Sequence, residues 1–259
     1  MNTPLRNFIA RIPVLRFWVA RSIFLRSRNP LRFWGVFSSQ AEAKAHIPAN
    51  LNAGFDDPYI TDEFDESIPM LDAETVVVLS RLMPEIKTIF DLGGNIGLCF
   101  YRYRSQITYP ADLRWTVCDV PFVNAAGRRI AEKRGETQLT FTDNQLDASG
   151  VDVYLTCGAL QYFEESFADL LAKLKEMPTH LVVNRVPMTP TETFFTLQHG
   201  DFSIVPYQIV NRDAFIASIK AMGYDLVESW QNDRVCDIIL RPDYFVRHYY
   251  GFHFKKAGS

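Results

Sequence analysis

The sequence predicts an α/β protein with a doubly wound, mostly parallel sheet. Three observations support this fold class. From Pro84 onward, short apolar runs alternate with helical stretches, a pattern typical of strand–helix–strand units. The first of these runs ends in a glycine pair, Gly93-Gly94, directly before a helical stretch. The chain of 259 residues is 47% apolar, which is enough for one large domain with a substantial core.

The expected elements follow one another in regular order after Pro84. Runs of apolar residues bounded by turn signals indicate strands, and apolar residues at helical spacing indicate the helices between them. Asn211 is the expected N-cap of the last helix, and Gly223 ends it. The segment between Pro187 and Asn211 is expected to be a long loop. Strands are predicted at 87–94, 113–121, 137–144, 151–160, 179–188 and 224–230, and helices at 95–107, 122–135, 166–177 and 211–223.

The segment before Pro84 is predicted to form a helical cap. SSQAEAKAHI indicates a short helix with Ser38 or Ser39 as its N-cap, and AETVVVLSRLM indicates a helix that ends at Pro84. Between them, GFDDPYITDEFDES is rich in turn residues and acids. These acids suit a cation or substrate site, but their composition favours a solvated loop. They are Asp56, Asp57, Asp62, Glu63, Asp65 and Glu66.

The N-terminus carries a strong charge asymmetry. The first 41 residues contain seven of the 27 basic residues, all arginine, and none of the 30 acidic residues. Aromatic side chains such as Trp18 lie between these arginines, and this composition suits an anionic membrane surface. A solvated or partner-packed extension is the alternative. From Arg6 to Arg26 the arginines recur every five residues, so on a helix they would spread around the axis instead of forming one stripe.

Composition also limits the compartment. No apolar stretch is long enough for an ordinary transmembrane helix. The four cysteines lack CxxC spacing, so we expect reduced core thiols and neither a disulfide framework nor a zinc site. The histidines show no metal-binding spacing either, so no metal is expected. The sequence therefore predicts a cytoplasmic protein, with a peripheral contact at the inner face of the membrane through residues 1–34 as a further expectation.

The glycine turn carries the main chemical signal. The motif is D-x-G-G-x-x-G, from Asp91 to Gly97, and it lacks the glycine spacing of a dinucleotide fingerprint. An acid two residues before Gly93 would repel a pyrophosphate but suits a ligand with a cationic ammonium group. S-adenosylmethionine (SAM) is such a ligand, since it carries an α-amino group and a sulfonium.

Two further acids follow the next two predicted strands. Asp119 ends the second strand, where a carboxylate can accept hydrogen bonds from both hydroxyls of a ribose. Asp143 ends the third strand, at a place suited to an adenine amino group. Each acid alone could equally be a helix N-cap or a turn residue. Three acids at the ends of three successive strands, behind a glycine turn, favour the ligand site.

Together these motifs resemble the class I SAM-dependent methyltransferases. The chain is most similar to an uncharacterised bacterial family often encoded near cell-surface polysaccharide genes. The likeness covers most of residues 34–254. It is carried by the stretches WGVFSSQAEAKAH, GFDDPYI, FDLGGNIGLCFYRYR, RWTVCDVP, VDVYLTCGALQYFEE, NRVPMTPTETFFTLQ, GYDLVESW and YYGFHF. The resemblance implies a Rossmann-like, seven-stranded sheet whose last strand, YYGFHF, runs antiparallel.

The resemblance also implies a cofactor site and a division of the chain. SAM contacts are expected at Asp91, Gly93, Gly94, Asn95, Gly97, Asp119, Asp143, Gly158 and Ala159. Many relatives have Glu at the position of Asp119, and the shorter side chain is still expected to reach the ribose. We divide the chain into an Arg-rich extension (1–34), a helical cap or substrate segment (35–84) and a SAM-binding methyltransferase domain (85–259).

The expected reaction is O-methylation of a glycan or of a glycolipid-linked intermediate, and the glycan rests on family context alone. Removal of a hydroxyl proton calls for a general base, and His199 is our candidate, with an exposed loop residue as the alternative. Arg185 would bind an anionic group or form a salt bridge, and Tyr162 would shape the pocket. Gln161, Asn184 and Gln198, which directly precede Tyr162, Arg185 and His199 in the sequence, are further candidates. A non-catalytic SAM-binding module and a nucleotide-sugar-modifying enzyme remain the other interpretations, and no nucleic-acid partner is expected.

Overall fold

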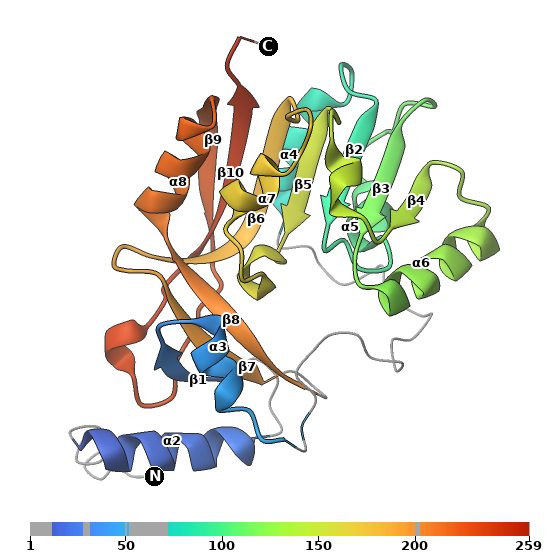
Figure 1. The fold of residues 1–259 in the computed structure, drawn as a ribbon. Helices are drawn as coiled ribbons and strands as arrows, with labels where there is room; N and C mark the ends of the chain where they lie inside the picture. Colours follow the sequence, from blue (N-terminus) through green and yellow to red (C-terminus); the bar gives the residue numbers. More distant parts are fainter. Residues whose placement is uncertain (1–11, 28–31, 50, 52–71, 200–202, 259) are drawn as a thin grey trace.

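The main body of the computed structural model is a seven-stranded sheet (Figure 1). The structure describes residues 12–27, 32–49, 51, 72–199 and 203–258. The strand order is β4-β3-β2-β5-β6-β10-β9. Their bounds are β2 Thr88–Leu92, β3 Arg114–Cys118, β4 Leu139–Thr142, β5 Val153–Cys157, β6 His180–Thr189, β9 Tyr224–Asn232 and β10 Tyr249–Lys256.

The register brings the carboxyl ends of the parallel strands to one edge of the sheet. Leu92 of β2 pairs with Cys118 of β3 and with Thr156 of β5, and Cys118 pairs in turn with Thr142 of β4. The residues that follow these strands therefore meet at the same edge. β10 pairs antiparallel with both β6 and β9, so the antiparallel last strand that the sequence implied is confirmed.

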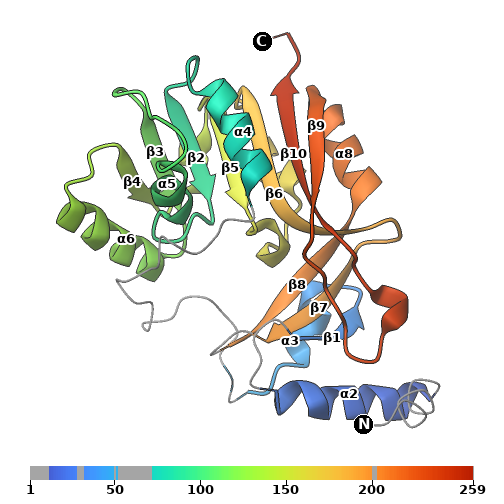
Figure 2. The same cartoon turned by 180° about the vertical axis from the view of Figure 1, so that it is seen from behind.

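Helices cover both faces of this sheet (Figures 1 and 2). The apolar side chains of each strand alternate between the two faces, so that Ile89 packs on one side and Phe90 on the other. One face carries α4 (Ala73–Leu82), α5 (Leu98–Tyr103) and α6 (Pro121–Arg134), and the other carries α7 (Phe167–Ala172) and α8 (Arg212–Ala221). Short 3-10 turns, η1 (Gln145–Ala148), η2 (Leu160–Tyr162) and η3 (Pro242–Tyr244), complete the connections.

A second, smaller layer lies beyond the carboxyl end of β6 (Figure 1). β1 (Arg32–Phe37), β7 (Phe194–His199) and β8 (Ile204–Asn211) form an antiparallel sheet, and β8 joins it to the last residues of β6. The expectation of a long loop between Pro187 and Asn211 is therefore wrong. This segment forms strands because its apolar residues are buried on both faces of the small sheet, which hides the usual alternation.

The N-terminal helices pack on this layer. α2 (Pro13–Leu25) lies across one face of the small sheet, and α3 (Gln40–Ala45) lies against the same sheet (Figure 2). Ser39 caps α3 by accepting a hydrogen bond from the backbone N–H of Glu42, as its sequence predicts. The proposed division after residue 34 falls inside β1. The acidic segment 56–66 lies outside the described residues.

Candidate functional site

The glycine turn after β2 is packed so closely that side chains are excluded. At Gly93, with φ +69°, a Cβ atom would lie 2.2 Å from the Cβ of Ala159. At Gly94 it would lie 2.5 Å from Oδ2 of Asp91. Gly97, with φ +92°, faces β4, where a Cβ would lie 2.9 Å from Leu139. Each glycine is therefore required by a close approach, and two of the three also by a left-handed backbone.

Asp91 lies completely buried beneath this turn. The indole Nε1–H of Trp115 donates to its Oδ2 at 3.1 Å, whereas its Oδ1 is buried with no hydrogen-bond partner. Burial raises the pKa of Asp91 to about 7, and the nearby Asp119 acts in the same direction, while the Trp115 hydrogen bond opposes them. A buried carboxylate oxygen without a donor is unfavourable, so this position suits a cationic ligand above the turn.

Asp119 connects the glycine turn to the end of β3. Its Oδ2 accepts a hydrogen bond from the backbone N–H of Asn95 at 2.9 Å, and its Oδ1 accepts one from Val120 N–H at 2.8 Å. Burial raises the pKa of this carboxyl, and the two backbone hydrogen bonds lower it in part. Val120, and not Asp119, is the N-cap of α6. The carboxylate is therefore held at the strand end, and each oxygen keeps a lone pair for a further donor.

Asn124 is a buried residue that the sequence analysis missed. Its amide Nδ2 lies 2.7 Å from the carbonyl oxygens of both Asp119 and Thr142, and 2.6 Å from Oδ1 of Asp143. This amide therefore ties the ends of β3 and β4 together. Asp143 is half exposed, and Asn144 is the residue that caps η1. The one available sequence signal was a polar residue among the small and apolar residues that form one face of a helix.

The end of β5 completes this group. The backbone N–H of Gly158, with φ +75°, donates to the carbonyl of Asn184 at 2.8 Å. Ala159 follows Gly158, and its Cβ fills the position that a side chain at Gly93 would need. The structure thus brings the predicted cofactor residues to one edge of the sheet, following β2, β3, β4 and β5.

A buried polar network adjoins Gly158 and includes a second missed residue, Asp72. Nδ2 of Asn184 donates to Oδ1 of Asp72 at 2.8 Å, and Nε of Arg185 lies 3.3 Å from the same oxygen. Arg185, with φ +58°, also donates to the carbonyl of Cys157 at 2.8 Å. Arg185 therefore forms the salt bridge that the sequence left as an alternative. Further donors to the network are Tyr103, Trp230 and Asn232.

Tyr162 and His199 lie on opposite faces of the small sheet. The hydroxyl of Tyr162, in η2, donates to Oε1 of Gln198 at 2.9 Å. Successive side chains of a strand point to opposite faces. His199 accordingly lies on the α2 side, where its ring packs edge-on against Phe24 with centroids 5.5 Å apart. Burial raises the pKa of Tyr162, so that its phenol is neutral at ordinary pH.

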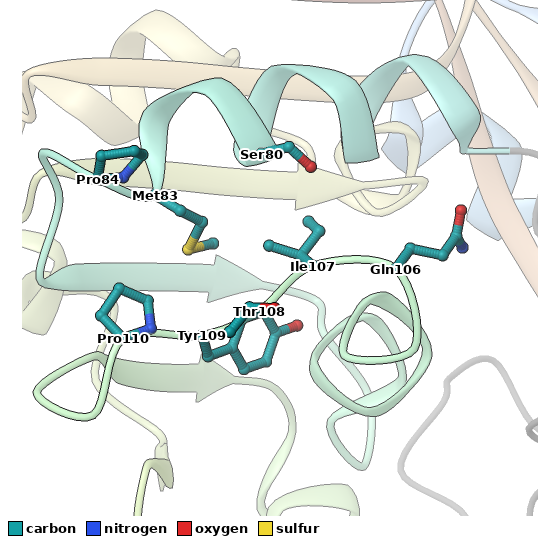
Figure 3. A pocket seen from close by; sticks show the side chains of 8 residues that line it. All are labelled: Ser80, Met83, Pro84, Gln106, Ile107, Thr108, Tyr109 and Pro110. Carbon is teal, nitrogen blue, oxygen red and sulfur yellow. The ribbon is translucent and has the colours of Figure 1, made fainter.

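A surface hollow lies at the opposite edge of the main sheet (Figure 3). It is bordered by the end of α4 and the segment before β3, that is, by Ser80, Met83, Pro84, Gln106, Ile107, Thr108, Tyr109 and Pro110. Pro84 and Pro110 precede strands β2 and β3, so the hollow lies at their amino ends. None of the residues that line it carries a charge.

The part of the chain that the structure describes contains neither a metal-binding cluster nor a membrane-spanning helix. Within it, no group of three or more His, Cys, Asp and Glu side chains is arranged to hold a metal ion. None of the described helices is both long and apolar enough to cross a membrane. All four cysteines are free and buried.

Comparison with known proteins gives the fold. Neither a protein-family profile nor a curated protein sequence matches the chain. Among solved structures, the PH0226 protein of Pyrococcus horikoshii is similar, with 9% identity over 74% of this chain and 93% of its own, and a TM-score of 0.51. A 1,6-didemethyltoxoflavin-N1-methyltransferase of Burkholderia thailandensis, solved with S-adenosylhomocysteine, has 16% identity over 74% of this chain and 79% of its own (TM-score 0.49). An O-methyltransferase family protein of the same organism has 16% identity over 96% of this chain and 71% of its own (TM-score 0.49). The Rossmann-like, doubly wound fold predicted from the sequence is confirmed.

Proposed function

We propose that this protein is a SAM-dependent methyltransferase. The observation that carries the proposal is the convergence of a tight glycine turn with acids on three adjacent strands. Asp91 lies beneath the turn, and Asp119 and Asp143 follow the next two strands at the same edge. A ligand with a cation at one end and a ribose next to it matches this order of groups.

The residues present fit this cofactor. Gly93 and Gly94 allow the turn to pack tightly on Ala159 and Asp91 without side chains of their own, so the turn would present bare backbone to a ligand. The charge of Asp91 would favour the α-amino group above the turn, because its buried Oδ1 has no hydrogen-bond donor within the protein. Asp119 is held by two backbone N–H groups with lone pairs free for ribose hydroxyls. Asp143 would meet the adenine edge, and Gly158 and Ala159 would form the opposite wall.

Catalysis would depend chiefly on positioning. When bound, SAM would supply the methyl group for in-line transfer to an acceptor at about 3–3.5 Å, and a hydroxyl acceptor would also have to lose its proton. Arg185 is already neutralised by Asp72, so it fixes the wall next to Gly158 in place. Tyr162 and Gln198 would offer polar groups to an acceptor on the face of the small sheet that is turned away from α2. The position of His199, packed against Phe24 on the α2 side, is unfavourable to a role as base. The neutral Tyr162 phenol and the Gln198 amide would instead hold and orient the acceptor.

The acceptor we propose is a glycan or a glycolipid-linked intermediate in the cytoplasm. This choice rests on the family resemblance of the sequence alone. The experiment that would identify the acceptor is incubation with labelled SAM and cell-envelope extracts. Label in a glycan fraction supports the choice, and label confined to another class of molecule overturns it.

Calorimetry with SAM and S-adenosylhomocysteine tests the cofactor. Asp119→Ala should weaken binding of both at least about tenfold, because it removes charge-assisted hydrogen bonds worth about 1.5–3 kcal/mol each. Asp112→Ala is the matched control, since this exposed carboxylate precedes the same strand at its other end. The control should bind like the unaltered protein. Absence of binding by the unaltered protein at high micromolar ligand would overturn the proposal, and binding of a nucleotide sugar instead would favour another enzyme class.

Turnover separates an enzyme from a binding module. Once an acceptor is known, Tyr162→Phe should lower kcat with cofactor affinity unchanged, whereas His199→Gln should leave kcat within about twofold. The opposite result would restore His199 as the base. Cofactor binding with no transfer to any acceptor fraction would indicate a non-catalytic module.

A further inference from the structure

Helix α2 carries large apolar side chains on its outer side as well as on its inner side, which is unusual for a helix at the surface. Its inner side packs on the small sheet through the buried Ala20 and Phe24. Its outer side exposes Val14 (69%), Trp18 (59%) and Leu15 (39%). These three residues lie within one turn of each other on one face. A helix with an apolar outer face normally has that face covered as well.

Exposed apolar side chains are concentrated on this helix. In the described part of the chain, eleven large apolar residues are exposed, and four of them lie between Ile12 and Trp18. Scattered apolar residues on a surface need no explanation, but a contiguous patch marks an interaction site. In both views, α2 lies at one end of the molecule, and no other described helix or strand runs along its outer side (Figures 1 and 2).

The charged side chains of α2 and its C-cap are all arginines, and one of them, Arg16, lies close enough to Asp243 to help lower the pKa of that carboxyl. The guanidinium of Arg21 lies 6.0 Å from the Trp18 ring and 5.9 Å from the Trp34 ring, at the border of the patch. Arg26 is exposed at the C-cap. The sequence from residue 1 to residue 41 contains no acid. Arginine beside tryptophan on an apolar helix matches the interface of an anionic lipid layer, where the aromatic ring enters the headgroup region and the cation meets phosphate.

The same charge argues against self-association through this face. In a two-fold symmetric dimer each patch would meet its own copy. The arginines of both copies would then come together with no acid on either helix to pair them. An anionic lipid surface supplies the missing negative charge.

We propose that the outer face of α2, formed by Val14, Leu15 and Trp18 and bordered by Arg21 and Arg26, binds the surface of an anionic membrane. The inner face of the helix keeps its packing on the small sheet, so docking needs no unfolding. The helix lies flat on the surface and does not cross it. Because no cofactor contact enters this reasoning, vesicle binding and SAM binding are separate readouts.

Vesicle co-sedimentation of the full chain tests the proposal. Phosphatidylcholine vesicles with phosphatidylglycerol should bind the protein, and vesicles of phosphatidylcholine alone should bind it at least about tenfold more weakly. Leu15→Ser with Trp18→Ser should remove binding to both. Val227→Ser with Val235→Ser is the matched control, because these residues are similarly exposed elsewhere. Arg26→Glu should weaken binding at least about fivefold, and the exposed Lys175→Glu should not.

Three outcomes would overturn the proposal. The unaltered protein could fail to bind either vesicle, it could bind both equally, or the Leu15 and Trp18 variant could bind as well as the control pair. Concentration-dependent dimerisation that the same variant abolishes, without vesicle binding, would show a second copy as the occupant instead. Thermal unfolding midpoints of the variants, expected to match the unaltered protein because the changed side chains are exposed, exclude loss of the fold as the cause.

Discussion

Replacement of Asp91 by Asn should make the protein more stable at alkaline pH and poorer at binding SAM. Asp91 takes up its proton near pH 7 in the folded protein, because burial raises its pKa to about 7. In the unfolded chain it does so at about pH 4. Between these values the folded state holds more protons, so the free energy of unfolding falls as pH rises. The contribution is present below about pH 4 and is lost by about pH 7.

The magnitude follows from the width of this interval. About three pH units at about 1.4 kcal/mol each give a loss of about 4 kcal/mol above pH 7. Asparagine avoids this loss because it is neutral. Its amide, however, takes the place of an oxygen that has no partner, at a cost of about 1–3 kcal/mol. We therefore expect Asp91→Asn to be more stable than the unaltered protein by about 1–3 kcal/mol at about pH 8.

Urea unfolding at two pH values measures this directly. From about pH 5 to about pH 8, the difference in unfolding free energy between variant and unaltered protein should change by about 3 kcal/mol in favour of the variant. This change does not depend on the cost of the buried amide. His180, whose pKa burial lowers to about 4, titrates in both proteins and cancels in the difference. Asp112→Asn, at an exposed carboxyl, should show no such change.

A difference that stays flat between the two pH values would refute the reasoning, whichever protein is the more stable. It would mean that Asp91 is ionised in the folded protein throughout this range. The cofactor gives a second readout, because SAM should raise the unfolding temperature of the unaltered protein and not that of the variant. A variant that gains stability and keeps full SAM affinity would leave the pKa argument intact but remove the cation from the proposed site.

Three further substitutions test the packing of the site. Gly94→Ala should abolish SAM binding in calorimetry, since its Cβ would lie 2.5 Å from the Asp91 carboxylate. Gly135→Ala is the control, because a Cβ there meets open space. It should lower the unfolding free energy by about 1 kcal/mol and leave SAM binding unchanged. Asp72→Ala should lower the unfolding free energy measured in urea by about 3–5 kcal/mol, because the largely buried Arg185 loses its carboxylate and Asn184 loses its acceptor. A loss below about 1 kcal/mol would contradict this. Asn124→Ala should cost about 1–3 kcal/mol in the same assay, and no loss would show that its contacts are dispensable.

The parallel sheet was predictable from sequence because its signals are local. Each strand is a short apolar run, and a glycine or an acid marks where the chain leaves it, as at Gly93 and Asp119. Parallel strands then place these local signals at one edge without further information. The likeness to a known family added the antiparallel β10, which periodicity alone did not indicate.

The residues that were missed depend on contacts between distant parts of the chain. Asp72 meets Asn184 across 112 positions, and nothing near either residue signals the other. The small sheet pairs Trp34 with Leu197, and its strands are buried on both faces, so their sequence lacks the alternation of a half-exposed strand. His199 was misplaced for the same reason. In a loop its ring could take many directions. In β7, neighbouring side chains point to opposite faces of the sheet, so His199 lies on the face opposite to Gln198, which bonds Tyr162.

Two aspartates of the same sheet show where its structure is arranged for function. Asp152, just before β5 at the amino edge, accepts hydrogen bonds at Oδ2 from the backbone N–H groups of Lys87 and Thr88 and from the Thr88 hydroxyl, all within 2.9 Å. Asp91, at the carboxyl edge, has one donor and a buried oxygen with none. Stability alone would favour the first arrangement everywhere, since an unpaired buried acceptor is costly. The left-handed backbone of Arg185 lies at the carboxyl edge as well. Unfavourable features of this kind are expected where a ligand completes the contacts, and they favour the proposed site at the glycine turn over the hollow beside α4.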